Sequence, residues 1–265
     1  MARSDGTAVT LDLWHTLIYL EPDAEEAYMD AQLDLAAEVL AGSATRPGAP
    51  PLSLPQLRES FGTVYADAVH EAQEGRSVPP GVQIQRAAAR VGRVPQPQAY
   101  LEGLARLVAA TPFLPAPGVL ELLRSLRSQG HRLAVISNTV GEPGESLRPR
   151  LVELGIDRWI DLYEFSDAHP WTKPAPEIFQ DALRQLGVVP SRAIHVGDGW
   201  VDVEGARRAA FLAGILFTGL QRYGHRYHAM FLPPGWESPP TDYRVGRLEE
   251  LPAMVDGIFD GHARR

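Results

Sequence analysis

From residue 118 onward the chain alternates short apolar runs with amphipathic stretches, and this alternation constrains the fold more than any other feature. Short runs rich in Val, Ile and Leu predict buried strands, whereas apolar residues three and four positions apart predict helices. The predicted order is helix 118–130, strand 131–137, helix 145–154, strand 159–165, helix 175–186, strand 192–196, helix 201–210, strand 212–217 and helix 248–259. Because strands that alternate with helices form right-handed crossovers, we predict a parallel α/β sheet covered by helices on both faces.

The first part of the chain shows a different pattern. A β-rich run at residues 7–13 predicts one more strand. Residues 24–111 then show only helical periodicity, with clusters of Pro and Gly between the stretches 25–40, 57–74, 82–91 and 98–110. The acidic residues that begin the first stretch, Glu25 among them, are expected only to favour the first helical turn. We therefore predict an all-helical unit at 21–111, inserted into an α/β unit made of 1–20 and 112–265.

Composition excludes several classes of function. The 265 residues carry 33 acidic against 25 basic side chains, a net charge of -8, so no basic face for nucleic acid is indicated. One cationic and aromatic stretch, 222–228, is expected to be a solvated loop or to bind an anionic group or a partner. No apolar run approaches the roughly 20 residues of a membrane span, and the absence of cysteine excludes disulfides and thiolate chemistry. We expect a cytoplasmic protein, a monomer or homodimer, that binds neither nucleic acid nor membrane.

The candidate site residues come directly after predicted strands. Asp12 ends the first strand and Ser137 the second. The strand that ends at residue 196 leads into Asp198 and Asp202. Lys173, before helix 175–186, is the single lysine beside 24 arginines, and a compact ammonium fits between anions where a guanidinium does not. In a parallel sheet these points meet at one edge, where carboxylates, a hydroxyl and a lysine are suited to Mg²⁺ and phosphate.

Four segments, in chain order, resemble the four sequence motifs of the haloacid dehalogenase superfamily of hydrolases. They are residues 11–17 (LDLWHTL), 135–138 (VISN), 173–179 (KPAPEIF) and 195–203 (HVGDGWVDV). The helical unit at 21–111 is similar to the C1 cap of that superfamily. The resemblance implies a Rossmann-like core with an inserted all-α cap. It also implies a hydrolase that acts on a small phosphorylated substrate with Mg²⁺ as its cofactor.

The resemblance implies a role for each matching residue. Asp12 would be the nucleophile that forms an aspartyl-phosphate, and also a Mg²⁺ ligand. The backbone carbonyl of Trp14 and the carboxylate of Asp198 would be further ligands, and Asp202 would be either a ligand or an orienting group. Ser137 and Lys173 would be catalytic residues that hold the phosphoryl oxygens, and Lys173 would keep Asp12 ionised. The substrate-binding set implied in this way is Ser137, Asn138, Lys173 and Trp14.

One position departs from the phosphatases of the superfamily. They usually carry a second aspartate two residues after the nucleophile, where it protonates the leaving group, and here that residue is Trp14. General acid–base help is worth about 10²–10⁴ in rate, and tryptophan cannot supply it. Two alternatives to a phosphatase therefore stay open. One is a haloacid dehalogenase in which Trp14 lines a halide cradle, although that branch lacks the Gly-Asp pair at 197–198. The other is an impaired relative that binds a phosphorylated ligand without turnover.

Other residues beside the motifs carry further predictions. His15 is a second possible proton donor, but we expect its side chain to point away from the reaction. Trp14, Trp171 and Trp200 either pack at the edge of the core or wall a water-poor site. Pro170 stands where many relatives of the superfamily have glycine.

Overall fold

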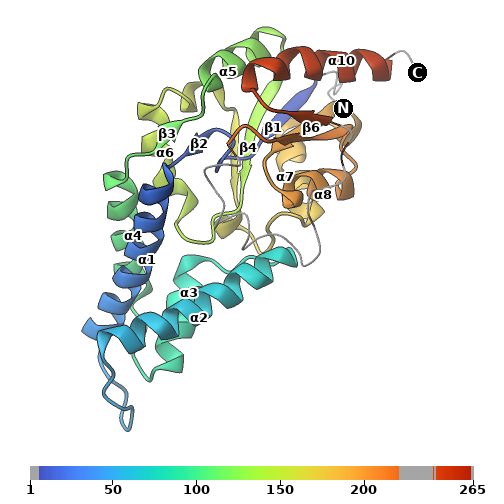
Figure 1. The fold of residues 1–265 in the computed structure, drawn as a ribbon. Coiled ribbons are helices and arrows are strands. Elements are labelled where there is room, and N and C mark those ends of the chain that lie inside the picture. Colours follow the sequence, from blue (N-terminus) through green and yellow to red (C-terminus); the bar gives the residue numbers. More distant parts are fainter. Residues whose placement is uncertain (1–5, 221–240, 242, 264–265) are drawn as a thin grey trace.

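The computed structural model describes residues 6–220, 241 and 243–263. Its centre is a sheet of six parallel strands in the order β5-β4-β1-β6-β7-β8 (Figure 1). The strands are β1 (Ala8–Leu11), β4 (Arg132–Ser137), β5 (Leu162–Phe165), β6 (Ala193–Gly197), β7 (Ala213–Phe217) and β8 (Tyr243–Val245). Strands added after β1 first extend the sheet on one side and then on the other, so the order reverses between β1 and β6. In open parallel sheets the ligand crevice lies beyond the strand ends at such a reversal.

Alternate side chains of the strands face two separate layers of helices. Val9 and Leu11 of β1 belong to an apolar cluster with α5 (Val119–Ser128), α6 (Gly144–Glu153) and α10 (Leu251–Ala263). Ala8 of the same strand belongs to a second cluster with α7 (Pro176–Leu186) and α8 (Trp200–Arg208). Strands buried on both faces are apolar at successive positions, which is why 131–137 carries no polar alternation. The predicted parallel, Rossmann-like α/β sheet is confirmed.

Four helices between β2 and β3 pack around an apolar cluster of their own. They are α1 (Pro22–Gly42), α2 (Leu54–Gln73), α3 (Pro80–Arg90) and α4 (Pro97–Ala110), and Figure 1 shows them extending away from the sheet. Phe61 and Tyr100 are buried at the centre of this cluster. Each helix has proline in its first turn, where the missing N–H would have no helical partner. The boundaries 20/21 and 111/112 of this unit remain a prediction.

Three short strands lie outside the sequence predictions. β2 (Ile18–Tyr19) and β3 (Leu114–Pro115) pair antiparallel where the chain enters and leaves the four helices, and β8 extends the sheet edge. Runs of two or three residues carry no readable alternation, so tertiary pairing decides their structure. The predicted strand 159–165 begins only at Leu162, because Trp159 belongs to a 3₁₀ turn, Asp157–Trp159.

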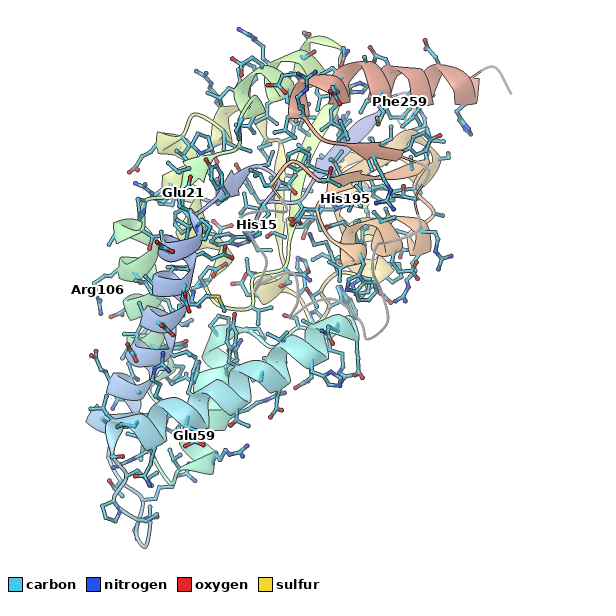
Figure 2. The ribbon with its side chains drawn as sticks, viewed as in Figure 1. His15, Glu21, Glu59, Arg106, His195 and Phe259 are labelled. Carbon is cyan, nitrogen blue, oxygen red and sulfur yellow. The ribbon has the colours of Figure 1, made fainter. Side chains whose placement is uncertain are left out.

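The interior of the molecule contains two histidines that sequence patterning alone does not bury. Figure 2 shows His15 and His195 within the body of the protein, whereas Glu59 and Arg106 lie on exposed faces of the helical unit. His15 is 1% exposed and His195 0%. In the described ranges, none of the helices combines the length and the apolar character needed to cross a membrane.

Candidate active site

Lys173 and two carboxylates meet beyond the carboxyl end of the sheet. Asp12 directly follows β1, and Asp202 lies in the first turn of α8. Lys173 Nζ donates to Asp12 Oδ1 and, at 2.6 Å, to Asp202 Oδ1. All three side chains are buried. Lys173 is 161 residues from Asp12 in the sequence, so it is the sheet topology that brings these charges together.

Asp202 is fixed by a buried network behind Lys173. Its Oδ1 lies 3.1 Å from His195 Nε2, and its Oδ2 accepts from the backbone N–H of Gly199 at 2.9 Å. His195 Nδ1 lies 2.7 Å from Thr10 Oγ1. Burial lowers the pKa of His195 despite Asp202, which favours a neutral ring that donates to Asp202 and accepts from Thr10. Gly197 leaves the space for this carboxylate, because a Cβ there would lie 2.2 Å from Asp202 Cγ.

The charges at this centre shift one another's pKa. Burial raises the pKa of Asp12 against the opposing effect of Lys173, and the carboxylates of Asp202 and Asp198 raise it further. Burial by itself would raise the pKa of Asp202, but Lys173 and His195 outweigh burial and lower it. Burial by itself would lower the pKa of Lys173, but the two carboxylates that it contacts raise it to about 12. Lys173 is therefore a permanent cation held between two carboxylates.

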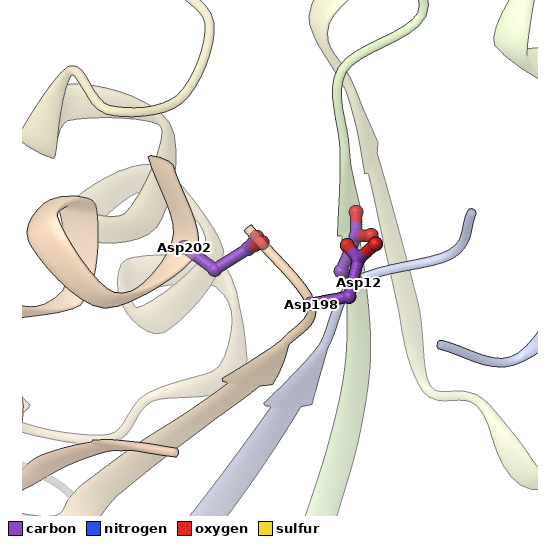
Figure 3. Close-up of side chains that lie close together, drawn as sticks. All are labelled: Asp12, Asp198 and Asp202. Carbon is purple, nitrogen blue, oxygen red and sulfur yellow. The ribbon is translucent and has the colours of Figure 1, made fainter. Parts of the chain in front are cut away.

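Asp198 adds a third carboxylate to this centre (Figure 3). It comes directly after β6, and one oxygen atom from each of Asp12, Asp198 and Asp202 lies within 4.8 Å of the others. Figure 3 shows the side chains of Asp12 and Asp198 ending side by side above neighbouring strands, while Asp202 approaches from its helix. When ionised, three carboxylates and the ammonium of Lys173 leave a formal charge of -2. An all-oxygen donor set with this excess of negative charge fits a hard divalent cation such as Mg²⁺.

Two residues at the end of β4 reach the same centre. Ser137 is fully buried, and its Oγ has no hydrogen-bond partner among the described residues, so the hydroxyl can bind a ligand. Asn138 instead binds the main chain of Lys173. Its Oδ1 accepts from Lys173 N at 2.8 Å, and its Nδ2 donates to Lys173 O at 3.0 Å. Both polar atoms of the Asn138 amide are thus engaged, which favours a positioning role over the predicted contact with substrate.

Trp14 turns its indole toward Glu142, a residue that sequence reasoning missed. Trp14 Nε1 donates to Glu142 Oε1 at 3.1 Å. The indole ring also packs against Tyr28 of α1 and against Phe113, with ring centroids 6.2 and 5.3 Å apart. Burial raises the pKa of Glu142 to about 7, although Trp14 and other donors to the carboxylate oppose the shift. Glu142 comes five residues after Ser137, and this position in a loop that follows a strand was the one sequence signal that pointed to it.

His15 joins the loop after β1 to the helical unit. Its Nε2 lies 3.2 Å from Glu25 Oε1 on α1. Its backbone φ of 54° is in the left-handed region, which non-glycine residues seldom enter. The expectation for Glu25 was therefore too narrow, because Glu25 is buried and contacts a residue beside the nucleophile as well as lying in a first helical turn.

The remaining aromatic residues near the motifs lie at the edge of the core. Trp171 packs against the cluster of α7 and α8 and pairs through its backbone with Arg76 of the helical unit. Pro170 is part of the same contact, since its carbonyl accepts from Ser77 N at 3.1 Å. Trp200 is buried where α8 begins. The predicted anion-binding stretch, 222–228, lies outside the described residues.

Comparison with known proteins agrees with this geometry. The family model of the haloacid dehalogenase-like hydrolases matches residues 7–210. A phosphoglycolate phosphatase from Cupriavidus necator is 29% identical over 249 residues, which cover 94% of this chain and 93% of that protein. A glyceraldehyde 3-phosphate phosphatase from Methanopyrus kandleri is 35% identical over 143 residues, which cover 53% of this chain and 56% of that protein. The crystal structure of a HAD phosphatase from Thermococcus onnurineus has a TM-score of 0.61 at 20% identity, covering 95% of this chain and 98% of that chain.

These matches assign the class first and then the family. A parallel sheet with a lysine and carboxylates beyond its carboxyl ends is the architecture of an α/β enzyme. The matched segment spans the four helices and all four motifs, and the chain belongs to the haloacid dehalogenase-like hydrolase family.

Proposed function

We propose that this protein is a Mg²⁺-dependent phosphatase that hydrolyses a small phosphorylated metabolite through an aspartyl-phosphate on Asp12. The observation that carries the proposal is the contact of Lys173 with both Asp12 and Asp202 beside a third carboxylate, Asp198. This arrangement provides a nucleophile, a fixed cation for phosphoryl oxygens and an excess of negative charge for a dication. The names of the phosphatases to which the chain is similar support the class of substrate.

The residues proposed to hold Mg²⁺ are Asp12 and Asp198, with the backbone carbonyl of Trp14. Asp202 was left with two possible roles, and its contacts favour the orienting one, because both of its oxygens already accept from Lys173, His195 or Gly199. A bound Mg²⁺ would neutralise negative charge, so that an anionic ester and an anionic carboxylate can approach each other.

The reaction proposed for these residues has two steps. An oxygen of Asp12 attacks the phosphorus, the bond between phosphorus and the ester oxygen breaks, and the departing oxygen takes a proton from solvent. Water then attacks the phosphorus of the aspartyl-phosphate, which releases inorganic phosphate and restores the carboxylate. Lys173 stabilises charge on one phosphoryl oxygen, because Asp202 and Asn138 hold it in place, and Ser137 Oγ donates to another.

Trp14 determines how this phosphatase should depend on its leaving group. Tryptophan has no acidic proton to transfer, and its indole N–H is already bound to Glu142. Turnover is therefore expected to fall steeply as the alcohol becomes a poorer leaving group, by about the 10²–10⁴ that a general acid otherwise supplies. 4-Nitrophenyl phosphate, whose phenolate leaves without protonation, should be hydrolysed faster than alkyl phosphates by this factor.

The test is phosphate release from a panel of alkyl and aryl phosphate monoesters, with Mg²⁺ and with the metal removed by a chelator. The proposal predicts activity that disappears on chelation and returns with added Mg²⁺. Trapping with a beryllofluoride phosphate mimic in the presence of Mg²⁺ would show whether Asp12 accepts a phosphoryl-like group. Silence across the panel, together with no beryllofluoride on Asp12, would overturn the proposal.

A second candidate function rests on Trp14 itself. An aromatic residue two positions after the nucleophile is what the dehalogenase alternative requires. Release of halide from 2-haloacids without Mg²⁺ would establish that alternative, and no release would remove it. Binding of phosphate esters without any turnover would instead identify an impaired relative.

A further inference from the structure

Glu142 forms a buried junction between the catalytic loops and the helical unit. It lies in the loop between β4 and α6 and is 5% exposed. Three side chains donate to its carboxylate: Trp14 Nε1 at 3.1 Å, Tyr28 OH at 3.4 Å and Gln32 Nε2 at 3.3 Å. Three donors directed at one carboxylate fit its ionised form, since a carboxylate only accepts. The junction therefore places a negative charge beside the residue that stands where an acid–base aspartate usually does.

The position of Glu142 is on the side of the site that faces away from the sheet. Trp14 is two residues after Asp12, and Glu142 is four residues after Asn138, which holds Lys173. Tyr28 and Gln32 belong to α1. A phosphoryl group held by Asp12 and Lys173 has the filled core of the sheet behind it, so the alcohol half of an ester has to extend toward these helices.

A small cavity of about 20 Å³ marks where the helical unit meets these loops. Glu142 and Glu25 both line it, together with Trp14, Tyr28, Gln32 and Tyr65. None of the described residues that line it is a lysine or an arginine, and Glu25 contacts His15 outside the cavity. An anionic group on this side would meet a buried carboxylate without a compensating cation, which is how binding sites reject a wrong ligand.

We propose that Glu142 makes this protein select phosphate monoesters whose alcohol half is neutral or cationic, and reject those whose alcohol half carries a second anion. The proposal rests on the phosphatase function proposed above. It separates this chain from the relative named for phosphoglycolate, an ester whose alcohol half carries a carboxylate. It agrees with the relative named for glyceraldehyde 3-phosphate, whose alcohol half is uncharged.

The test compares three esters of similar size: 2-phosphoglycolate, 2-hydroxyethyl phosphate and phosphoethanolamine, with anionic, neutral and cationic alcohol halves. Binding is measured by calorimetry, and kcat/KM by phosphate release, at pH 8 with saturating Mg²⁺. We expect both measurements to favour the neutral and cationic esters over 2-phosphoglycolate by roughly 10- to 100-fold. Glu142→Gln should reduce this ratio to about 3-fold or less, because the amide is isosteric and uncharged.

Two further variants make the result specific. Gln32→Lys keeps Glu142 and adds a cation beside it, so it should also improve 2-phosphoglycolate relative to the other esters; it serves if Glu142→Gln proves unstable by thermal unfolding. Glu38→Gln removes the same charge from an exposed position of α1 and should keep the ratio of the unmodified protein. A ratio that is unchanged in both Glu142→Gln and Gln32→Lys would overturn the proposal, as would a preference of the unmodified protein for 2-phosphoglycolate.

The two proposals fail in distinguishable ways. If the esters bind with the expected ranking but none is hydrolysed, the selectivity of Glu142 stands and the phosphatase function fails. If the esters are hydrolysed without the ranking, the phosphatase function stands and the role of Glu142 fails. If none of the three esters binds, both proposals fail.

Discussion

The side-chain amide of Asn138 binds the main chain of Lys173 on both sides, through Lys173 N at 2.8 Å and Lys173 O at 3.0 Å. The two residues are 35 positions apart, and Asn138 directly follows β4. The ammonium of Lys173 is held separately, by Asp12 and Asp202. The lysine is thus fixed at its backbone and at its charge, and each attachment gives a prediction of its own.

Asn138→Ala should lower kcat while leaving the fold intact. The change leaves the N–H and C=O of Lys173 without partners, at a cost of about 1–3 kcal/mol for each buried group, and frees the lysine backbone to move. We expect a lower melting temperature and a loss of about 10-fold or more in kcat. Asn138→Asp keeps one acceptor and should lie between the two. Steady-state kinetics with thermal unfolding checks this, and a normal kcat in Asn138→Ala would show that the bracket has no catalytic importance.

Lys173→Arg should be severely impaired although the chain is otherwise rich in arginine. The guanidinium is planar and larger than the ammonium, so it does not fit between Asp12 and Asp202 in this buried space. Lys173→Met should be worse, because three carboxylates then lack their cation. A loss of about 10²–10³ in rate is expected from removing one such electrostatic group. The measurement is kcat at saturating Mg²⁺, and near-normal activity in Lys173→Arg would mean that a positive charge of any shape suffices.

Asp12→Asn should abolish hydrolysis without destabilising the protein. The amide keeps the volume of the carboxylate but is no nucleophile toward phosphorus. Burial and two neighbouring carboxylates raise the pKa of Asp12, so the ionised form is unfavourable in the folded protein without a bound cation. The melting temperature in the absence of metal should therefore be equal to or above that of the unmodified protein. Retained turnover would show that Asp12 is not the nucleophile.

Asp198→Asn should raise the concentration of Mg²⁺ needed for half-maximal activity. A neutral amide is a poorer ligand for a hard cation than a carboxylate, and we expect a shift of about 10-fold or more. Asp67→Asn, an exposed position of α2, removes the same charge and is the matched control. Activity titrated with Mg²⁺ gives the answer, and an equal requirement in both variants would place the metal elsewhere.

The stability of the protein should fall as the pH drops below about 6.5, partly because of His131. Burial lowers the pKa of His131 below its usual 6.5, and Asp256 opposes the shift only in part. The unfolded chain then binds the proton more readily than the folded protein, so protonation favours unfolding as the pH falls toward the folded-state pKa. His131→Gln removes this group, and thermal unfolding between pH 7 and 5 should show a weaker dependence. An identical pH profile in the variant would assign the effect to other groups.

Local sequence patterns were sufficient for the long elements and for the residues at the ends of the strands. Periodicity identified the helices of both units and the central strands, because burial on one or two faces imposes a repeat that is visible along the chain. The strands β2, β3 and β8 carry no such repeat and were missed. Asp12, Ser137, Lys173, Asp198 and Asp202 were found because each follows a strand or lies in a motif, and a parallel sheet brings such positions to one edge.

The sequence by itself determined which residues would meet at that edge, but only the tertiary structure decided what each of them contacts. Ser137 and Asn138 are adjacent in one motif, yet one hydroxyl is open to a ligand and the other side chain is occupied by Lys173. Asp202 could be read as a metal ligand until His195 and Gly199 were seen at its oxygens. Glu142 could not be found, because its donors come from Trp14 and from α1, more than 100 residues away. Side-chain hydrogen bonds depend on directions and distances within a few ångströms, and residue spacing along the chain does not contain them.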